Sequence, residues 1–273
     1  MKILLILLLS LFVNACSIKH PIYLYQDLPV YELAKAIDDE NLETIEEILE
    51  KEPNILKYKV ENTIGVLKMA ILNDRYKSCK KILDLGISPD FELKDGCSWF
   101  SFACGVKDSK YLKLFMRYNP DINYEARLVK GGTRYYTPLM SAIYHSMQNF
   151  KILLNAGADY NKGIDRFGGD WTPLASALLE EDIHIAHYLL LELGAKFKEA
   201  VQRVQSSTYP NGKYIYIIDY LRFLEFPLVS EEHKLKMECV EYMKKHGVDY
   251  FKTPIPDHIQ RKYKNDPEYL EKY

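Results

Sequence analysis

Two hexapeptides share one pattern and decide the fold: Thr137-Pro138-Leu139-Met140-Ser141-Ala142 and Thr172-Pro173-Leu174-Ala175-Ser176-Ala177. A threonine can cap a helix N-terminus with its side chain, and a proline suits the first helical turn, where its missing N–H costs nothing. Each hexapeptide therefore predicts the start of a helix. The alanine that ends each one is small enough to let a second helix approach closely.

The pattern recurs along the chain. Three further segments align with the two hexapeptides, and the aligned alanines stand at positions 36, 70, 103, 142 and 177. The spacings between them are 34, 33, 39 and 35 residues. A polar break and a second apolar helix follow each alanine, and four of the second helices end in a turn. Because one helix pair cannot bury its apolar side alone, such repeats must stack on one another.

This pattern resembles the ankyrin repeat, which has a period of about 33 residues and a Thr-Pro-Leu-His motif. Repeat four keeps Thr137-Pro138-Leu139 and Gly157-Ala158-Asp159, with Met140 where histidine is usual. The resemblance covers 27–195 and extends to 250 through a degenerate sixth repeat. It implies an all-α solenoid of about five to six helix-turn-helix repeats with long hairpin loops.

Several segments interrupt the period. The 39-residue spacing places extra residues in one hairpin, 124–136, and the next hairpin, 160–171, contains Gly168-Gly169. The segment 198–212 then interrupts the repeat again. The Tyr- and Ile-rich segment 213–224 predicts a helix. The polar segment 251–273 predicts an extended or partly helical tail packed on the last repeat.

The first residues predict export. A basic residue and a short apolar run, 3–13, are typical of a secretory signal and are too short to span a bilayer. Phe12-Val13-Asn14-Ala15-Cys16 resembles the lipobox of bacterial lipoproteins. That resemblance implies a signal peptide over 1–15, acylation of Cys16 (including palmitate) and a tether over 16–26. Ser17 implies an outer-membrane anchor facing the periplasm of a Gram-negative cell. The alternative is an ordinary cleaved signal with a chance cysteine.

Composition and motifs argue against catalysis and nucleic-acid binding. The formal net charge is −2, whereas a nucleic-acid binder carries a basic face. The sequence contains no Walker loop, nucleophile elbow, HExxH or CxxC motif. His184 and His187 could share a helix face and hold a metal, but polar residues there also suit a solvated surface. We expect no enzyme, no cofactor and no metal.

The cysteines after Cys16 allow two interpretations. Cys79, Cys104 and Cys239 fall at apolar helix positions, where a free cysteine behaves as a small hydrophobe. An oxidising compartment also permits a disulfide, and Cys79 with Cys104 is the pair to test. Cys97 is expected to be the exposed cysteine.

Charge gathers in the first repeat. Residues 27–56 contain two bases and ten acids, a net charge of 2 − 10 = −8. Such a run is typical of a solvated capping face, and it could also be a docking face for a basic partner.

The resemblance also suggests a binding surface. Ankyrin proteins bind other proteins, usually through hairpin tips and first helices. Carried over by position, the expected partner-binding residues are Asn73, Cys97, Arg134, Tyr135, Tyr136, Tyr144, His145, Phe167, Trp171, Leu179 and Glu180.

The expected periplasmic location and the ankyrin-like repeats together suggest a function. A bacterial lipoprotein with ankyrin repeats resembles immunity proteins encoded beside secreted antibacterial toxins, notably type VI lipase effectors. This resemblance implies a protein that is monomeric when free and captures a toxin without catalysis. The alternative is an envelope scaffold or adaptor for an endogenous periplasmic or membrane partner.

Overall fold

The computed structural model describes residues 20–58, 64–93, 95–126, 137–144, 146–166, 169–205 and 211–273. The chain forms two compact units, Met1–Ala156 and Gly157–Tyr273. In the described part, no helix is long and apolar enough to cross a bilayer.

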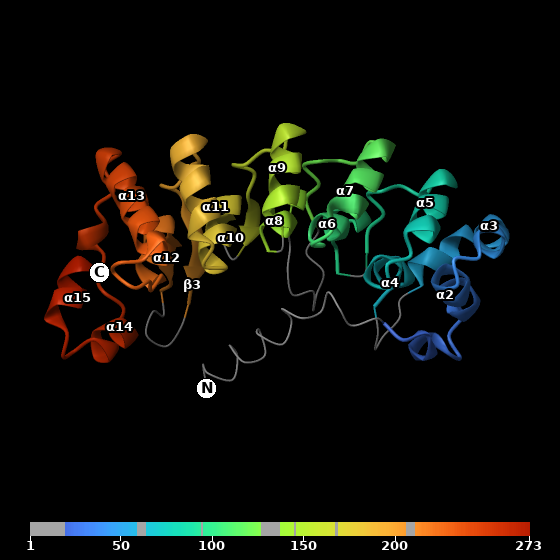
Figure 1. Ribbon diagram of the computed structural model, residues 1–273, viewed down its shortest axis with the longest axis horizontal. Coiled ribbons are helices and arrows are strands. Elements are labelled where there is room, and N and C mark those ends of the chain that lie inside the picture. Colours follow the sequence, from blue (N-terminus) through green and yellow to red (C-terminus); the bar gives the residue numbers. More distant parts are fainter. Residues whose placement is uncertain are drawn as a thin grey trace. The chain divides into compact units, whose positions relative to one another are not determined.

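The first unit stacks helix pairs. First helices pack on the first helices of neighbouring repeats, and second helices pack on second helices (Figure 1). The pairs are α2 (Tyr31–Asp38) with α3 (Leu42–Lys51), α4 (Val66–Leu72) with α5 (Tyr76–Asp84), α6 (Trp99–Cys104) with α7 (Ser109–Phe115), and α8 (Pro138–Ile143) with α9 (Met147–Asn155). Short 3-10 helices are η2 (Ile22–Tyr25), η3 (Pro53–Lys57) and η4 (Met116–Tyr118).

The predicted helix starts are confirmed. The Thr137 hydroxyl accepts the Met140 N–H at 3.3 Å, and the Thr172 hydroxyl caps its own helix in the same way. The five aligned alanines are all buried, with at most 4% of their surface exposed. The small side chain therefore allows close helix packing in every aligned repeat.

Trp99 links two repeats of the first unit. It is fully buried, and its indole N–H donates to the Leu67 carbonyl at 3.0 Å. Its ring meets Phe115 edge-on, with centroids 4.7 Å apart. The side chain thus connects α6 to both α4 and α7.

The second unit combines two helix pairs with two hairpins. The first hairpin pairs β1 (Ile164–Arg166) with β2 (Gly169–Trp171), and the second pairs β3 (Ala200–Val204) with β4 (Lys213–Tyr216). A Cβ at Gly169 would lie 2.4 Å from the Val201 and Gln202 backbone, so only glycine fits where β2 approaches β3. The remaining elements are α10 (Pro173–Leu179), α11 (Ile183–His187), the π-helical turn η5 (Tyr188–Glu192), α12 (Ile217–Phe223), α13 (Glu231–Lys245), η6 (Tyr250–Lys252), α14 (Asp257–Lys262) and α15 (Pro267–Lys272).

The predicted helix over 213–224 is wrong in its first third. Lys213–Tyr216 is strand β4, and the helix α12 begins only at Ile217. Tyrosine and isoleucine favour strands, and here they pair with β3 in an antiparallel hairpin. The Asp219 carboxylate accepts the Tyr216 N–H at 2.9 Å, which fixes the change from strand to helix.

The segment predicted as the second helix of a sixth repeat is helical. α13 ends at Lys245, Gly247 just beyond it has a φ of 90°, and the Val248 N–H donates to the Met243 carbonyl. This is the left-handed stop that glycine permits.

The segment after the sixth repeat is helical. Ile259, Tyr269 and Tyr273 form a small buried cluster, and partly buried Leu228 packs against it from the loop before α13. The helices α14 and α15 therefore cover the end of the sixth repeat.

Two buried cations lie under this cover. Lys236 is fully buried and donates to the Leu224 carbonyl at 2.8 Å, and Arg222 donates to the Tyr273 backbone oxygen at 2.8 Å. The Lys236 ammonium also lies 3.9 Å from the centre of the Tyr273 ring. Burial, reinforced by the nearby Arg222 charge, lowers the pKa of Lys236 to about 7.

Candidate protein-binding surface

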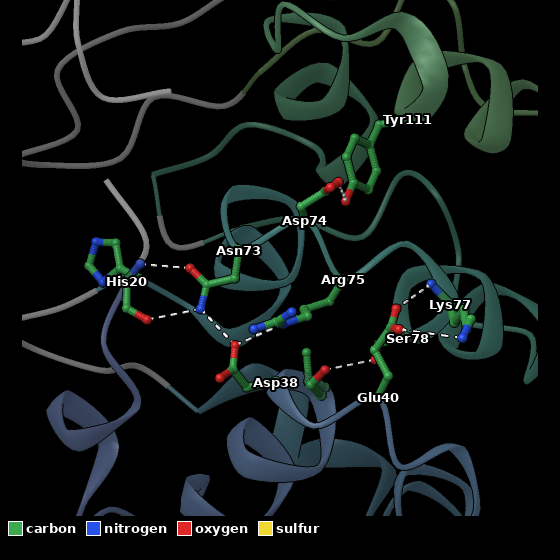
Figure 2. A network of polar contacts seen from close by, with 10 residues as sticks. His20, Asp38, Glu40, Asn73, Asp74, Arg75, Lys77, Ser78 and Tyr111 are labelled. Carbon is green, nitrogen blue, oxygen red and sulfur yellow. Dashed lines mark hydrogen bonds and ion pairs between the residues drawn. The ribbon is translucent and has the colours of Figure 1, made fainter. Parts of the chain in front are cut away.

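Polar side chains join the first three repeats at the turns between their helices (Figure 2). We call this set the polar seam; its labelled members are His20, Asp38, Glu40, Asn73, Asp74, Arg75, Lys77, Ser78 and Tyr111. The Asp38 carboxylate accepts from Arg75 Nε and from Asn73 Nδ2, both at 2.9 Å. The Ser78 hydroxyl donates to the Ile37 carbonyl at 2.8 Å. Each turn is thereby bonded to the next repeat.

Acidic residues occupy a left-handed position in two of these turns. Glu40 and Asp74 have φ angles of 52° and 62°, where glycine would be less strained. Glu181 holds the corresponding position between α10 and α11, with a φ of 59°. Glu40 uses this position to accept the Lys77 N–H at 2.9 Å. The N-cap residue of α5, Arg75, makes no side-chain cap bond, so Glu40 caps a helix of the following repeat.

Asp74 repeats this arrangement one repeat later. Its carboxylate accepts the Tyr111 hydroxyl at 2.9 Å and pairs with Lys110. Burial alone would raise the pKa of Asp74, but the hydrogen bonds from Lys110 and Tyr111 outweigh it and hold the pKa below its ordinary value.

We expect Glu40→Ala to destabilise the first unit by about 1 kcal/mol, because a helix cap is lost while the strained turn remains. Glu40→Gln keeps an acceptor oxygen and should cost less than Glu40→Ala. Urea unfolding followed by circular dichroism measures both. Equal stability of Glu40→Ala and the parent chain would show that the contact contributes nothing.

Several acidic side chains of the first repeat pair with basic side chains of the second repeat. Asp38 and Glu40 take part in the polar seam, and Glu46 pairs with Lys81 at 2.7 Å. Glu43 and Glu50 are exposed, so part of the acidic run remains at the surface. The run therefore also bonds one repeat to the next, a role that the charge count alone did not indicate.

The predicted binding residues that the structure describes fall into three groups. Asn73, Cys97 and Trp171 are buried; Tyr144 is half-buried; Leu179 and Glu180 are exposed. The remaining positions lie outside the described residues, namely Arg134, Tyr135, Tyr136, His145 and Phe167, as does the predicted lipidation site, Cys16.

The prediction that Trp171 contacts a partner is corrected, because the structure places this side chain in the core. Only 2% of it is exposed, and its indole N–H donates to the Ser176 hydroxyl at 2.8 Å. The Tyr220 ring meets it edge-on, with centroids 5.7 Å apart. A partner cannot reach this side chain, because α10 and α12 enclose it.

The four cysteines that the structure describes are buried. Cys79, Cys97, Cys104 and Cys239 form no disulfide with one another, so Cys97 is not the exposed cysteine and the predicted bridge between Cys79 and Cys104 is absent. Burial raises the pKa of the Cys239 thiol to about 12 and raises those of Cys79 and Cys104 as well. Disulfide exchange needs a thiolate, which these sites disfavour.

The prediction for Asn73 is also corrected, because its side chain already binds the N-terminal segment of this chain. Its amide bonds both backbone groups of His20, as well as Asp38. The expected tether 16–26 therefore packs on the body from His20 onward.

The two histidines do not form a metal cluster. His187 Nε2 lies 2.7 Å from a Glu238 carboxylate oxygen, and His184 is exposed. Across the residues that the structure describes, no three histidine, cysteine or acidic side chains converge to hold a metal.

The β3–β4 hairpin offers a surface that sequence reasoning missed. We define the hairpin surface as Arg203, Tyr214 and Tyr216. Tyr214 and Tyr216 are 47% and 39% exposed, and the Arg203 guanidinium lies 5.5 Å from the centre of the Tyr214 ring. Arg203 also donates to the Asn211 carbonyl at 2.6 Å. Tyrosine and arginine held in fixed positions are the residue types that dominate protein interfaces.

Comparisons with known proteins agree with the fold. No family model matches the sequence. No curated protein matches it either. A solved structure, the ankyrin repeat domain of Bcl-3, a unique member of the IkappaB protein family, is similar with a TM-score of 0.51 and 16% identity. The match covers 80% of this chain and 86% of that chain. The repeats, their buried alanines and this likeness show that the chain has an ankyrin-repeat fold.

Proposed function

We propose that this chain is a non-catalytic protein-binding module, anchored by lipid at Cys16 and facing the periplasm. Its partner would be a secreted antibacterial toxin delivered by a type VI system, with lipases as the first class to test. The chain would act as an immunity protein by capturing the toxin.

The hairpin surface carries the binding part of this proposal. Arg203, Tyr214 and Tyr216 expose aromatic and cationic groups on a paired hairpin, so little backbone freedom is lost when a partner binds. The lipobox-like residues at Cys16 support the compartment. The toxin class comes from the resemblance to immunity lipoproteins.

The immunity role is tested by deleting the gene and exposing the cells to toxin-armed siblings. We expect deletion to reduce survival and the restored gene to rescue it. Unchanged survival, together with stable co-purification of an endogenous envelope protein, would favour the scaffold function instead.

Changing Tyr214 and Tyr216 to alanine together should abolish rescue and the capture of the toxin, because the aromatic contact area is lost. The matched control is Tyr58→Ala, since Tyr58 is also 39% exposed but lies in the first unit. Survival assays and co-purification measure both variants, with circular dichroism to verify folding. Full rescue by the double variant would exclude the hairpin surface as the binding site.

A further inference from the structure

The N-terminal segment is clamped to the first unit by a buried side chain. The His20 N–H donates to the Asn73 side-chain oxygen at 2.6 Å, and the Asn73 amide donates back to the His20 carbonyl at 2.9 Å. Asn73 is only 2% exposed. Because Asn73 bonds both the N–H and the carbonyl of His20, it fixes the position and the direction of the backbone there.

A second contact fixes the segment five residues later. Tyr25 is fully buried, and its hydroxyl donates to the Ile64 carbonyl at 2.8 Å. The 3-10 helix η2, which contains Tyr25, packs on α2. The residues between His20 and Tyr25 are therefore held at both ends.

Two apolar side chains between these contacts remain exposed. Tyr23 is 67% exposed and Leu24 is 37% exposed, although both lie on the same short helix as buried Tyr25. A tyrosine and a leucine fixed at the surface form an apolar patch that no described part of the chain covers. We call this pair the η2 patch.

The proposed anchor limits what can lie beside this patch. Four peptide units separate Cys16 from His20, and at 3.8 Å for each unit their Cα atoms are at most about 15 Å apart. A single helix with its side chains is about 10–12 Å across. A folded partner domain would not fit between the clamped body and the bilayer, whereas the lipid headgroups themselves come within reach.

We propose that the η2 patch contacts the lipid surface and docks the first unit against the bilayer; this inference rests on the proposed acylation of Cys16. Tyrosine suits the headgroup region, where its ring lies in an apolar zone and its hydroxyl stays hydrated. Asp27 and Glu32 are exposed just beyond the patch, so the surface that it fits is zwitterionic. Asn73 is the positioning residue that holds the patch towards the membrane.

The test uses the acylated mature chain, residues 16–273, in phosphatidylcholine vesicles. Tyr23→Trp adds an indole at the patch, while the native Trp99 and Trp171 are buried and provide a constant background. Brominated lipids quench an indole that enters the bilayer. We expect the Tyr23→Trp emission to shift to shorter wavelength and to be quenched severalfold more than that of Val229→Trp. Val229 is 98% exposed and lies in the second unit.

Vesicle flotation separates the two proposals. Flotation with equal quenching of Tyr23→Trp and Val229→Trp would overturn the docking and leave the anchor standing. A protein that does not float with the vesicles would overturn both. Adding Asn73→Ala to Tyr23→Trp should reduce quenching while flotation stays complete. Unchanged quenching in this folded double variant would overturn the clamp.

Discussion

Replacing Trp171 with alanine is expected to destabilise the second unit by about 3–5 kcal/mol, the usual cost of removing a buried large aromatic side chain. The change leaves a cavity between α10 and α12 and removes the edge-on contact with Tyr220. It also leaves the Ser176 hydroxyl without its indole donor. Urea unfolding followed by circular dichroism measures the loss. Trp99 then reports on the first unit alone, because it is the sole remaining tryptophan.

Leu179→Ala is the matched control, because Leu179 ends α10, the helix whose Ser176 bonds Trp171, and is 44% exposed. Its substitution should change stability by no more than about 0.5 kcal/mol. If Trp171→Ala proved as mild as this control and yet lost the partner, Trp171 would be a surface contact after all.

The second large effect concerns the buried Lys236. Its pKa is lowered to about 7 in the folded chain, against an ordinary value of 10.5. Below about pH 7 both states carry the proton, so this residue adds no pH dependence. Between about pH 7 and 10 the unfolded chain keeps the proton and the folded chain does not. The Lys236 contribution to the free energy of unfolding should therefore rise with pH, by about 1.4 kcal/mol for each pH unit.

This contribution is isolated by comparison with Lys236→Met. Burial also raises the pKa values of Cys239 and Tyr250, and these groups lower stability at alkaline pH in both proteins. The difference in free energy of unfolding between parent and Lys236→Met cancels their effect and should change steadily from pH 7 to 10. Lys234→Met is the control, since Lys234 lies on the same helix, α13, but is exposed. A pH-independent difference for Lys236→Met would mean that the lysine stays charged when buried.

The helical repeats could be predicted because their signals are local. A threonine cap, a proline beside it and a buried alanine each act within one turn of a helix, so the sequence of Thr137–Ala142 contains the whole argument. Strand β4 was missed because its four residues are too short for a clear alternating pattern, and its partner β3 lies beyond a further turn.

The candidate site was harder to predict because its contacts are distant in sequence. Asn73 looks like an exposed turn residue until His20, 53 positions earlier, is placed against it. Trp171 looks like an interface residue until Tyr220 covers its ring. Residue type and repeat position indicated where the chain makes contacts. They could not distinguish a partner protein from another part of this chain.

The side chains of Glu40 and Asp74 each accept a hydrogen bond from the repeat that follows, Glu40 from the Lys77 N–H and Asp74 from the Tyr111 hydroxyl. Each of these bonds requires a particular side-chain length on one repeat and a particular donor on its successor. The opening repeats are therefore not interchangeable modules. A chain rebuilt by duplicating or reordering them would place a short aspartate where a glutamate's reach is required. Recombination within this part of the protein is consequently restricted to exchanges that keep each acidic turn with its own successor.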